Sequence, residues 1–261
     1  MKLLPIGISD FKEIKTGNYY YVDKTLLIQE LLDQGGQTVL LPRPRRFGKT
    51  LNLSMLYYFF SNTENSADLF LNTAISQQAH HMAQQGQYPV IFLTFKQVKE
   101  ETWEKAYKKI AKIIAQLFEQ HKHIVNDTFS EKERIEYNNI LNETSSLLHL
   151  GSSLKFLNDL LHRHYNKKVI ILLDEYDAPI QTAFLNDYYK EMIALVQDLL
   201  GSALKDNNKL ERGVLTGILR TSKEGIFSGL NNLKVCTLLE EQFSDKFGFT
   251  QPEVDSFFGR I

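Results

Sequence analysis

Short, continuously apolar segments alternate along this chain with longer segments in which apolar residues recur at helical spacing. The apolar runs lie at residues 38–41 (TVLL), 88–95 (YPVIFLTF), 169–173 (VIILL), 212–219 (RGVLTGIL) and 233–239 (LKVCTLL). Strands that are apolar throughout are typical of a sheet buried on both faces. Strands that alternate with helices predict an α/β fold, in which helices flank a mainly parallel sheet of about five strands.

Helical spacing is clearest between 103 and 121, where apolar residues recur every three or four positions. Further helices are expected at 51–62, 153–165 and about 187–205, and the polar stretch at about 122–150 is expected to be partly helical and exposed. Near the carboxyl end, Thr250 precedes Glu253 by three residues and Pro252 lies between them. This arrangement predicts the start of another helix.

Composition narrows the class of protein. The chain has 261 residues, 43% of them hydrophobic, and a formal net charge of −1, so we expect a sizeable core and no strong general attraction to nucleic acid. A single cysteine, Cys236, excludes an internal disulfide and favours a reducing compartment. No apolar run reaches the roughly 18–20 residues that span a bilayer, and residues 1–11 make a poor secretion signal. A cytoplasmic protein that does not enter a membrane is predicted.

The segment RPRRFGKT, residues 43–50, ends like a phosphate-binding loop and stands between an apolar strand and a helix. In such a loop Gly48 allows close backbone approach, Lys49 places its charge on the terminal phosphates, and Thr50 offers a hydroxyl to Mg²⁺. The start of the following helix adds its positive end. Arg43 stands where the motif has its first glycine, and the alternative is a basic turn that happens to end in Gly-Lys-Thr. The candidate nucleotide-binding residues are Arg43, Pro44, Arg45, Arg46, Phe47, Gly48, Lys49, Thr50 and Leu51.

The three arginines of this loop leave two interpretations open. Guanidinium groups suit phosphate oxygens, yet Arg43, Arg45 and Arg46 cannot all contact one nucleotide. Some of them would then form a solvated basic lip or contact a nucleic acid or protein partner.

The strand 169–173 ends in the acidic sequence Asp174-Glu175. In a Mg²⁺-dependent ATPase, one such carboxylate holds the metal together with the loop hydroxyl and the next activates the attacking water. We therefore expect Asp174 and Thr50 at the metal and Glu175 as the catalytic base. Ligands lie beyond the carboxyl ends of parallel strands, so both motifs can face one cleft. The alternative is an acidic strand end that caps the next helix, a role also open to Asp177.

Arg220 follows the strand 212–219 and is the candidate for contact with the γ-phosphate, although a plain loop residue is equally compatible with its position. The histidine pairs His121/His123 and His162/His164 are two residues apart, so on a helix they point in different directions and do not predict a metal site. Cys236 lies in an apolar run and is expected to be buried and inert.

The segments RPRRFGKTLNLSML, LLDEYDAPI, GILRTSKEGIFSGLNNLKV and SDKFGFT, with the opening IGISDFKEI…YYYVDKTLLIQELL, closely resemble the bacterial AAA-ATPase-like family. The resemblance covers nearly the whole chain and includes the arginine in place of the first loop glycine. It implies ATP bound by Lys49 and Thr50, Asp174 on Mg²⁺, and Glu175 as base. It also implies a P-loop NTPase fold of the additional-strand type, with the strand 212–219 between the loop strand and the acidic strand. By analogy, residues 20–25 are expected near the adenine, although Asp23 and Thr25 also suit a helix start.

In that family the P-loop domain is usually followed by a PD-(D/E)XK nuclease-like domain. The sequence predicts an amino-terminal segment 1–36 packed near the nucleotide site, an ATPase core 37–245, and 246–261 as the start of a truncated helical region. The leading hypothesis is thus an ATPase domain that drives or switches a nuclease-like domain, and homo-oligomerisation is compatible with it. The rival hypothesis is a nucleotide-gated or non-hydrolysing module that binds nucleic acid or a protein partner through its arginine-rich loop.

Overall fold

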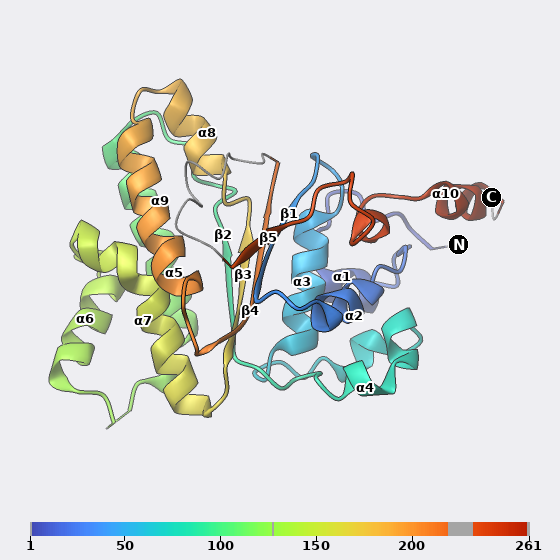
Figure 1. Cartoon of the computed structure of the whole chain (residues 1–261), viewed down its shortest axis with the longest axis horizontal. Helices are drawn as coiled ribbons and strands as arrows, with labels where there is room; N and C mark the ends of the chain where they lie inside the picture. The colour runs from blue at the N-terminus through green and yellow to red at the C-terminus, as the bar shows by residue number, and fades with distance from the viewer. Residues whose placement is uncertain (1, 127, 219–231, 260–261) are drawn as a thin grey trace.

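The computed structural model describes residues 2–126, 128–218 and 232–259 of the chain (Figure 1). Within them, one parallel sheet has the strand order β2-β3-β4-β1-β5. Its strands are β1 (Thr38–Pro42), β2 (Val90–Thr94), β3 (Val169–Asp174), β4 (Leu210–Gly217) and β5 (Leu233–Val235). Because β4 lies between β3 and β1, the predicted additional strand between the acidic strand and the loop strand is confirmed.

Helices cover both faces of the sheet, as Figure 1 shows. One side carries α1 (Phe11–Thr16), α2 (Leu26–Asp33), α3 (Lys49–Phe60) and α4 (Ala79–Met82). The other carries α5 (Trp103–Gln120), α6 (Glu131–Leu141), α7 (Leu147–Tyr165), α8 (Ala178–Leu185) and α9 (Tyr189–Leu204). The last helix, α10 (Gln251–Phe258), projects beside the amino-terminal end of the chain.

The apolar strands feed two separate hydrophobic cores. Leu40, Ile171 and Leu173 point into the core beneath α5, α7 and α9, whereas their sequence neighbours Val39 and Leu172 point into the core beneath α1, α2 and α3. Successive strand side chains alternate between faces, so a sheet covered on both sides needs apolar residues at every position. This requirement explains the continuous apolar runs.

The amino-terminal segment is fastened to α3 by a small polar cluster. Asp10 accepts a hydrogen bond from Glu13 N at the start of α1, while its second carboxylate oxygen lies 3.1 Å from both Ser54 Oγ and Tyr58 Oη. Ser54 Oγ also accepts a hydrogen bond from Phe11 N at 2.9 Å. The segment therefore packs on the helix that begins at the candidate phosphate loop.

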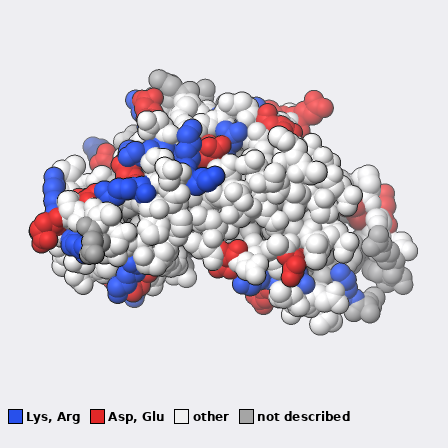
Figure 2. All heavy atoms as spheres, turned by 90° about the horizontal axis from the view of Figure 1, so that it is seen from below, with Lys and Arg blue, Asp and Glu red and all other residues white. Residues whose placement is uncertain are grey.

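Positively and negatively charged side chains lie together on the face seen from below in Figure 2, away from the loop that follows β1. Figure 2 shows Lys and Arg side chains gathered over the half that carries α5 to α9, with Asp and Glu side chains among them. Of the helices that the structure describes, none is long and apolar enough to cross a membrane.

Candidate nucleotide-binding site

The loop between β1 and α3 has a left-handed backbone at two positions. Gly48, directly before α3, has φ +77°, and Arg46 has φ +67°. Arg43 is not among the residues with positive φ, and its N–H donates to Gly217 O at 3.0 Å, extending the pairing of β1 with β4. The position that usually holds the first loop glycine therefore needs no glycine here, since its backbone avoids the left-handed region.

Lys49 is buried inside the loop. Its Nζ donates to Arg43 O at 3.0 Å and to Pro44 O at 2.9 Å, so the loop wraps around the ammonium group. Burial lowers the pKa of Lys49 from its ordinary value, and the nearby carboxylates, Glu175 most strongly, act in the opposite direction. The loop thus holds a positive charge that faces the acidic end of β3.

Asp174, at the end of β3, is fully buried and held through both carboxylate oxygens. Its Oδ2 accepts a hydrogen bond from Thr50 Oγ1 at 2.7 Å, and its Oδ1 accepts one from Thr216 Oγ1 at 2.7 Å. The two motifs that lie 124 residues apart in the sequence therefore meet directly. Thr216, whose hydroxyl orients Asp174 from the neighbouring strand, was missed by the sequence analysis because it lies within an apolar run.

Glu175 is half-buried and has φ +50°, a left-handed conformation that is unusual for a residue other than glycine. Two residues on, Asp177 directly precedes α8, yet its side chain does not cap that helix. Asp177 Oδ2 instead accepts hydrogen bonds from Ile218 N at 2.9 Å and from Gln181 Nε2 at 2.7 Å. Asp177 therefore fastens the turn after β3 to the end of β4.

The three loop arginines have different surroundings. Arg43 is only 1% exposed, and its guanidinium donates to the carbonyls of Pro42, Cys236 and Phe243 at 2.7–3.0 Å. This geometry favours a structural role for Arg43 over the phosphate contact considered above. Arg45 and Arg46 are exposed and make no ion pair with any described residue. Arg220 lies outside the described residues.

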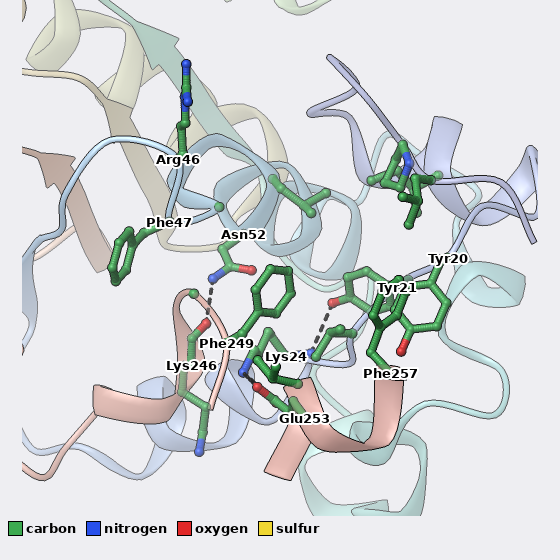
Figure 3. Close-up of a pocket in the computed structure, with 18 residues that line it drawn as sticks. Tyr20, Tyr21, Lys24, Arg46, Phe47, Asn52, Lys246, Phe249, Glu253 and Phe257 are labelled. Carbon is green, nitrogen blue, oxygen red and sulfur yellow. Dashed lines mark hydrogen bonds and ion pairs between the residues drawn. The ribbon is translucent and has the colours of Figure 1, made fainter. Parts of the chain in front are cut away.

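A cavity of about 460 Å³ opens beside Gly48 at the start of α3. Its walls are mainly apolar and come from three parts of the chain that are far apart in sequence (Figure 3): the amino-terminal residues 4–5, 14 and 20–24, the loop and helix residues 46–48 and 51–52, and the carboxyl-terminal residues 246–257. Residues 20–24 thus do lie next to the phosphate loop, while Asp23 Oδ1 accepts a hydrogen bond from Thr25 N at 2.8 Å at the start of α2.

An ion pair closes one end of this cavity. Lys24 Nζ lies 2.6 Å from Glu253 Oε1 and donates to Asp245 O at 2.7 Å, and the ring of Tyr20 contacts that of Phe257 with centroids 4.9 Å apart. The predicted helix start at Thr250 is confirmed, and a capping box with Glu253 is present there. The contribution of α10 to the cavity could not be predicted, because a capping pattern does not say what the helix packs against.

Comparison with known proteins agrees with this geometry. The family model described as "Predicted AAA-ATPase" matches residues 5–227, which include the loop 43–50 and Asp174-Glu175. The chain belongs to this AAA-ATPase-like family. It is also similar to a protein of Azotobacter chroococcum mcd 1 named "Uncharacterized protein in vnfD 5'region", with 29% identity over 259 residues. The match covers 98% of this chain and 45% of that protein, so the chain spans less than half the length of this relative. No solved structure matches.

The oxygen atoms at the AAA-ATPase loop suit Mg²⁺ better than a softer metal. Thr50 Oγ1 and Asp174 Oδ2 are hard donors 2.7 Å apart, and Mg²⁺ in nucleotide sites takes one or two protein oxygens and completes its shell with phosphates and water. Among the described residues there is no group of three or more His, Cys, Asp or Glu side chains that could hold a metal on their own. Cys236 is buried, as the sequence predicts.

Proposed function

We propose that this chain is an ATPase domain that binds Mg-ATP at residues 43–51 and hydrolyses it with water activated at Glu175. The observation that carries the proposal is the 2.7 Å hydrogen bond between Thr50 Oγ1 and Asp174 Oδ2. It places the hydroxyl of the phosphate loop against a buried carboxylate at the end of a parallel strand, where P-loop ATPases hold the metal of Mg-ATP.

The chain's own residues account for phosphate binding. The backbone N–H groups of residues 46–50 and the positive end of α3 face the phosphates. Lys49 exchanges its contacts with the Arg43 and Pro44 carbonyls for phosphate oxygens, and Arg45 and Arg46 add positive charge at the rim. When bound, Mg²⁺ held by Thr50 and Asp174 neutralises charge on the β- and γ-phosphates.

Hydrolysis needs a base on the γ-phosphate side of the loop. Glu175 follows Asp174 directly, and among the nearby carboxylates it acts most strongly to raise the pKa of Lys49. It accepts a proton from water as the water oxygen bonds to the γ-phosphorus, while the bond to the β-phosphate oxygen breaks and ADP leaves. We assign to Arg220 a contact with the γ-phosphate, because in the sequence it follows the end of β4, the strand that lies between β3 and β1.

The base of the nucleotide occupies the cavity next to Gly48. The aromatic side chains of Tyr21 and Phe249 offer flat surfaces to a planar ring. In this proposal residues 1–36 are the segment that covers the nucleotide, 37–245 are the ATPase core, and 246–261 begin a helical region. The single buried cysteine fits a cytoplasmic location. Control of a nuclease-like domain rests on resemblance to the family.

The test is Mg²⁺-dependent phosphate release by the wild type, Lys49→Ala and Glu175→Gln. We expect Lys49→Ala to abolish nucleotide binding and Glu175→Gln to bind ATP with turnover reduced by about 10²–10⁴-fold, the usual contribution of a general base. Arg163→Gln, on the exposed carboxyl-terminal part of α7, is the matched surface control and should keep full turnover. Equal turnover in all the proteins would refute the proposal.

A second candidate function is supported by the exposure of Arg45 and Arg46, which have no ion-pair partner among the described residues. These side chains could bind the phosphate backbone of a nucleic acid or an acidic protein partner. Salt-sensitive DNA binding that is lost in the double variant Arg45→Gln/Arg46→Gln, together with no heat of binding for ATP, would favour this function over the ATPase.

A further inference from the structure

One polar side chain in the wall of the cavity is not explained by phosphate binding or hydrolysis. Asn52 lies on α3, two residues after Thr50, and is only 3% exposed. It lines the cavity beside Gly48. Its oxygen is not among the fully buried polar atoms that lack a partner, so it is open to the cavity, and a ligand that covers it must supply a hydrogen-bond donor, because an unpaired polar group in such a place is costly.

The two ends of the Asn52 side chain differ in their partners. Nδ2 donates to Lys246 O at 2.8 Å, whereas Oδ1 accepts no hydrogen bond from any described residue. Figure 3 shows the nitrogen turned to the Lys246 carbonyl and the oxygen on the opposite side, toward the cavity and Phe249. The amide cannot rotate by 180°, because this would set its oxygen against the Lys246 carbonyl oxygen.

The cavity therefore presents a fixed acceptor in apolar surroundings. Of the charged residues that line the cavity, Lys24 and Glu253 are paired with each other at 2.6 Å, and Lys246 is paired with Glu30 and Asp245. Arg46 lies at the loop and is exposed. A ligand that fills the cavity satisfies Asn52 only by bringing an N–H or O–H donor to its oxygen. A ligand with an acceptor at the same point leaves two oxygens facing each other.

We infer that Asn52 determines base specificity: its Oδ1 accepts a hydrogen bond from the exocyclic amino group of adenine. The inference rests on the proposed function and deepens it. Adenine carries an amino group at C6, whereas hypoxanthine carries a carbonyl oxygen there. A site built to hydrogen-bond a donor rejects the analogue that lacks it, because the buried group of the protein is then left unpaired.

The experiment is calorimetric titration of the wild type, Asn52→Leu and Asn138→Leu with ADP, inosine diphosphate, 3′-deoxy-ADP and inorganic tripolyphosphate. Asn138 lies exposed on α6, so Asn138→Leu is a matched control. We expect the wild type and this control to bind ADP about tenfold more tightly than inosine diphosphate, as one buried hydrogen bond implies. Asn52→Leu should bind the two equally and bind tripolyphosphate as the wild type does.

The outcomes separate this inference from the proposed function. A wild type that binds neither tripolyphosphate nor ADP refutes the proposed function. Binding of tripolyphosphate and ADP without preference over inosine diphosphate, or a preference that survives in Asn52→Leu, overturns only the role of Asn52. A wild type that binds 3′-deoxy-ADP more weakly than ADP, but binds inosine diphosphate as tightly as ADP, also overturns it. Asn52 Oδ1 would then accept its hydrogen bond from the sugar hydroxyl. Should Asn52→Leu fail to fold, the wild-type comparison of ADP with N6,N6-dimethyl-ADP decides, because a dimethylated amino group cannot donate.

Discussion

At the scale of single residues, Arg43 shows how a phosphate loop can lack its first glycine. The Arg43 backbone continues the pairing of β1 with β4, and its guanidinium joins the end of β1 to the segment after β5 through the carbonyls of Cys236 and Phe243. The guanidinium also lies 4.9 Å from the ring centroid of Phe247. Arg43, which replaces the first glycine of the usual motif, thus connects the loop to the carboxyl-terminal segment.

Replacing Arg43 by methionine should therefore destabilise the protein. The change leaves three carbonyls without their donor in a buried place, and we expect a loss of about 2–4 kcal/mol in the free energy of unfolding. Urea denaturation of Arg43→Met beside Arg45→Met measures this, because Arg45 is exposed and its replacement should change stability by less than about 0.5 kcal/mol. Equal stabilities of the two variants would contradict the structural role.

His121 should make stability depend on pH. Its burial, aided by the neighbouring His123, lowers the pKa of His121 from 6.5 to about 4. Between these values the unfolded chain binds a proton that the folded chain does not, so stability rises with pH and is lost as pH falls from about 6.5 to about 4. We expect His121→Gln to reduce the change in the free energy of unfolding over this pH range by about 1–3 kcal/mol. Urea denaturation at several pH values measures it. The exposed His149→Gln is the control, and an unchanged pH slope in His121→Gln would contradict the prediction.

At the scale of elements, α10 is attached to the rest of the protein mainly through the wall of the cavity. The Lys24–Glu253 ion pair and the Tyr20–Phe257 ring contact join α10 to the amino-terminal segment. Gly248 N donates to Phe47 O at 3.1 Å just before this helix, so the same segment also touches the phosphate loop. The position of α10 is therefore coupled to the two sides of the cavity.

Breaking the ion pair should loosen α10 without unfolding the core. In Lys24→Met the largely buried ammonium is lost, and we expect backbone amides of residues 253–258 to exchange with deuterium about tenfold faster. Lys155→Met, which breaks the more exposed pair with Asp159 on α7, is the control. The prediction fails if exchange in α10 is the same in both variants.

All five strands and the long amphipathic helix α5 were predictable, because their patterns record burial directly. The helix α7 begins at Leu147 instead of 153, since Ser146 caps it and Gly151, which looks like a helix breaker, lies where α7 approaches α9. A Cβ on Gly151 would stand 2.8 Å from Cβ of Asp198.

The strand β5 ends at Val235, well short of residue 239. The cavity could not be predicted, because it forms only where three distant segments meet.

At the scale of the whole molecule, the candidate nucleotide site joins parts that span the chain. The loop, the end of β3, the amino-terminal segment and the segment before α10 all border it. A ligand that binds only the folded state stabilises the entire fold by mass action. The free energy of unfolding of the whole protein should therefore increase when a nucleotide binds.

We expect Mg-ADP at one hundred times its Kd to raise the free energy of unfolding by about 2.7 kcal/mol and Tm by about 5–10 °C. Glu175→Gln should show the same rise, because it alters the base and leaves the phosphate loop intact, whereas Lys49→Ala should show none. Differential scanning calorimetry makes the measurement. A wild-type Tm that does not respond to Mg-ADP would speak against the site.

The left-handed backbone of Glu175 sets the proposed catalytic role against stability at a single position. A glutamate there costs about 1 kcal/mol or more relative to a residue that accepts φ +50° easily. Asparagine tolerates that conformation, so Glu175→Asn should be inactive and yet more stable in urea denaturation than the active protein. Random mutagenesis followed by selection for solubility alone would then tend to replace Glu175. The proposed catalytic base therefore stands at a position whose backbone conformation favours a different residue.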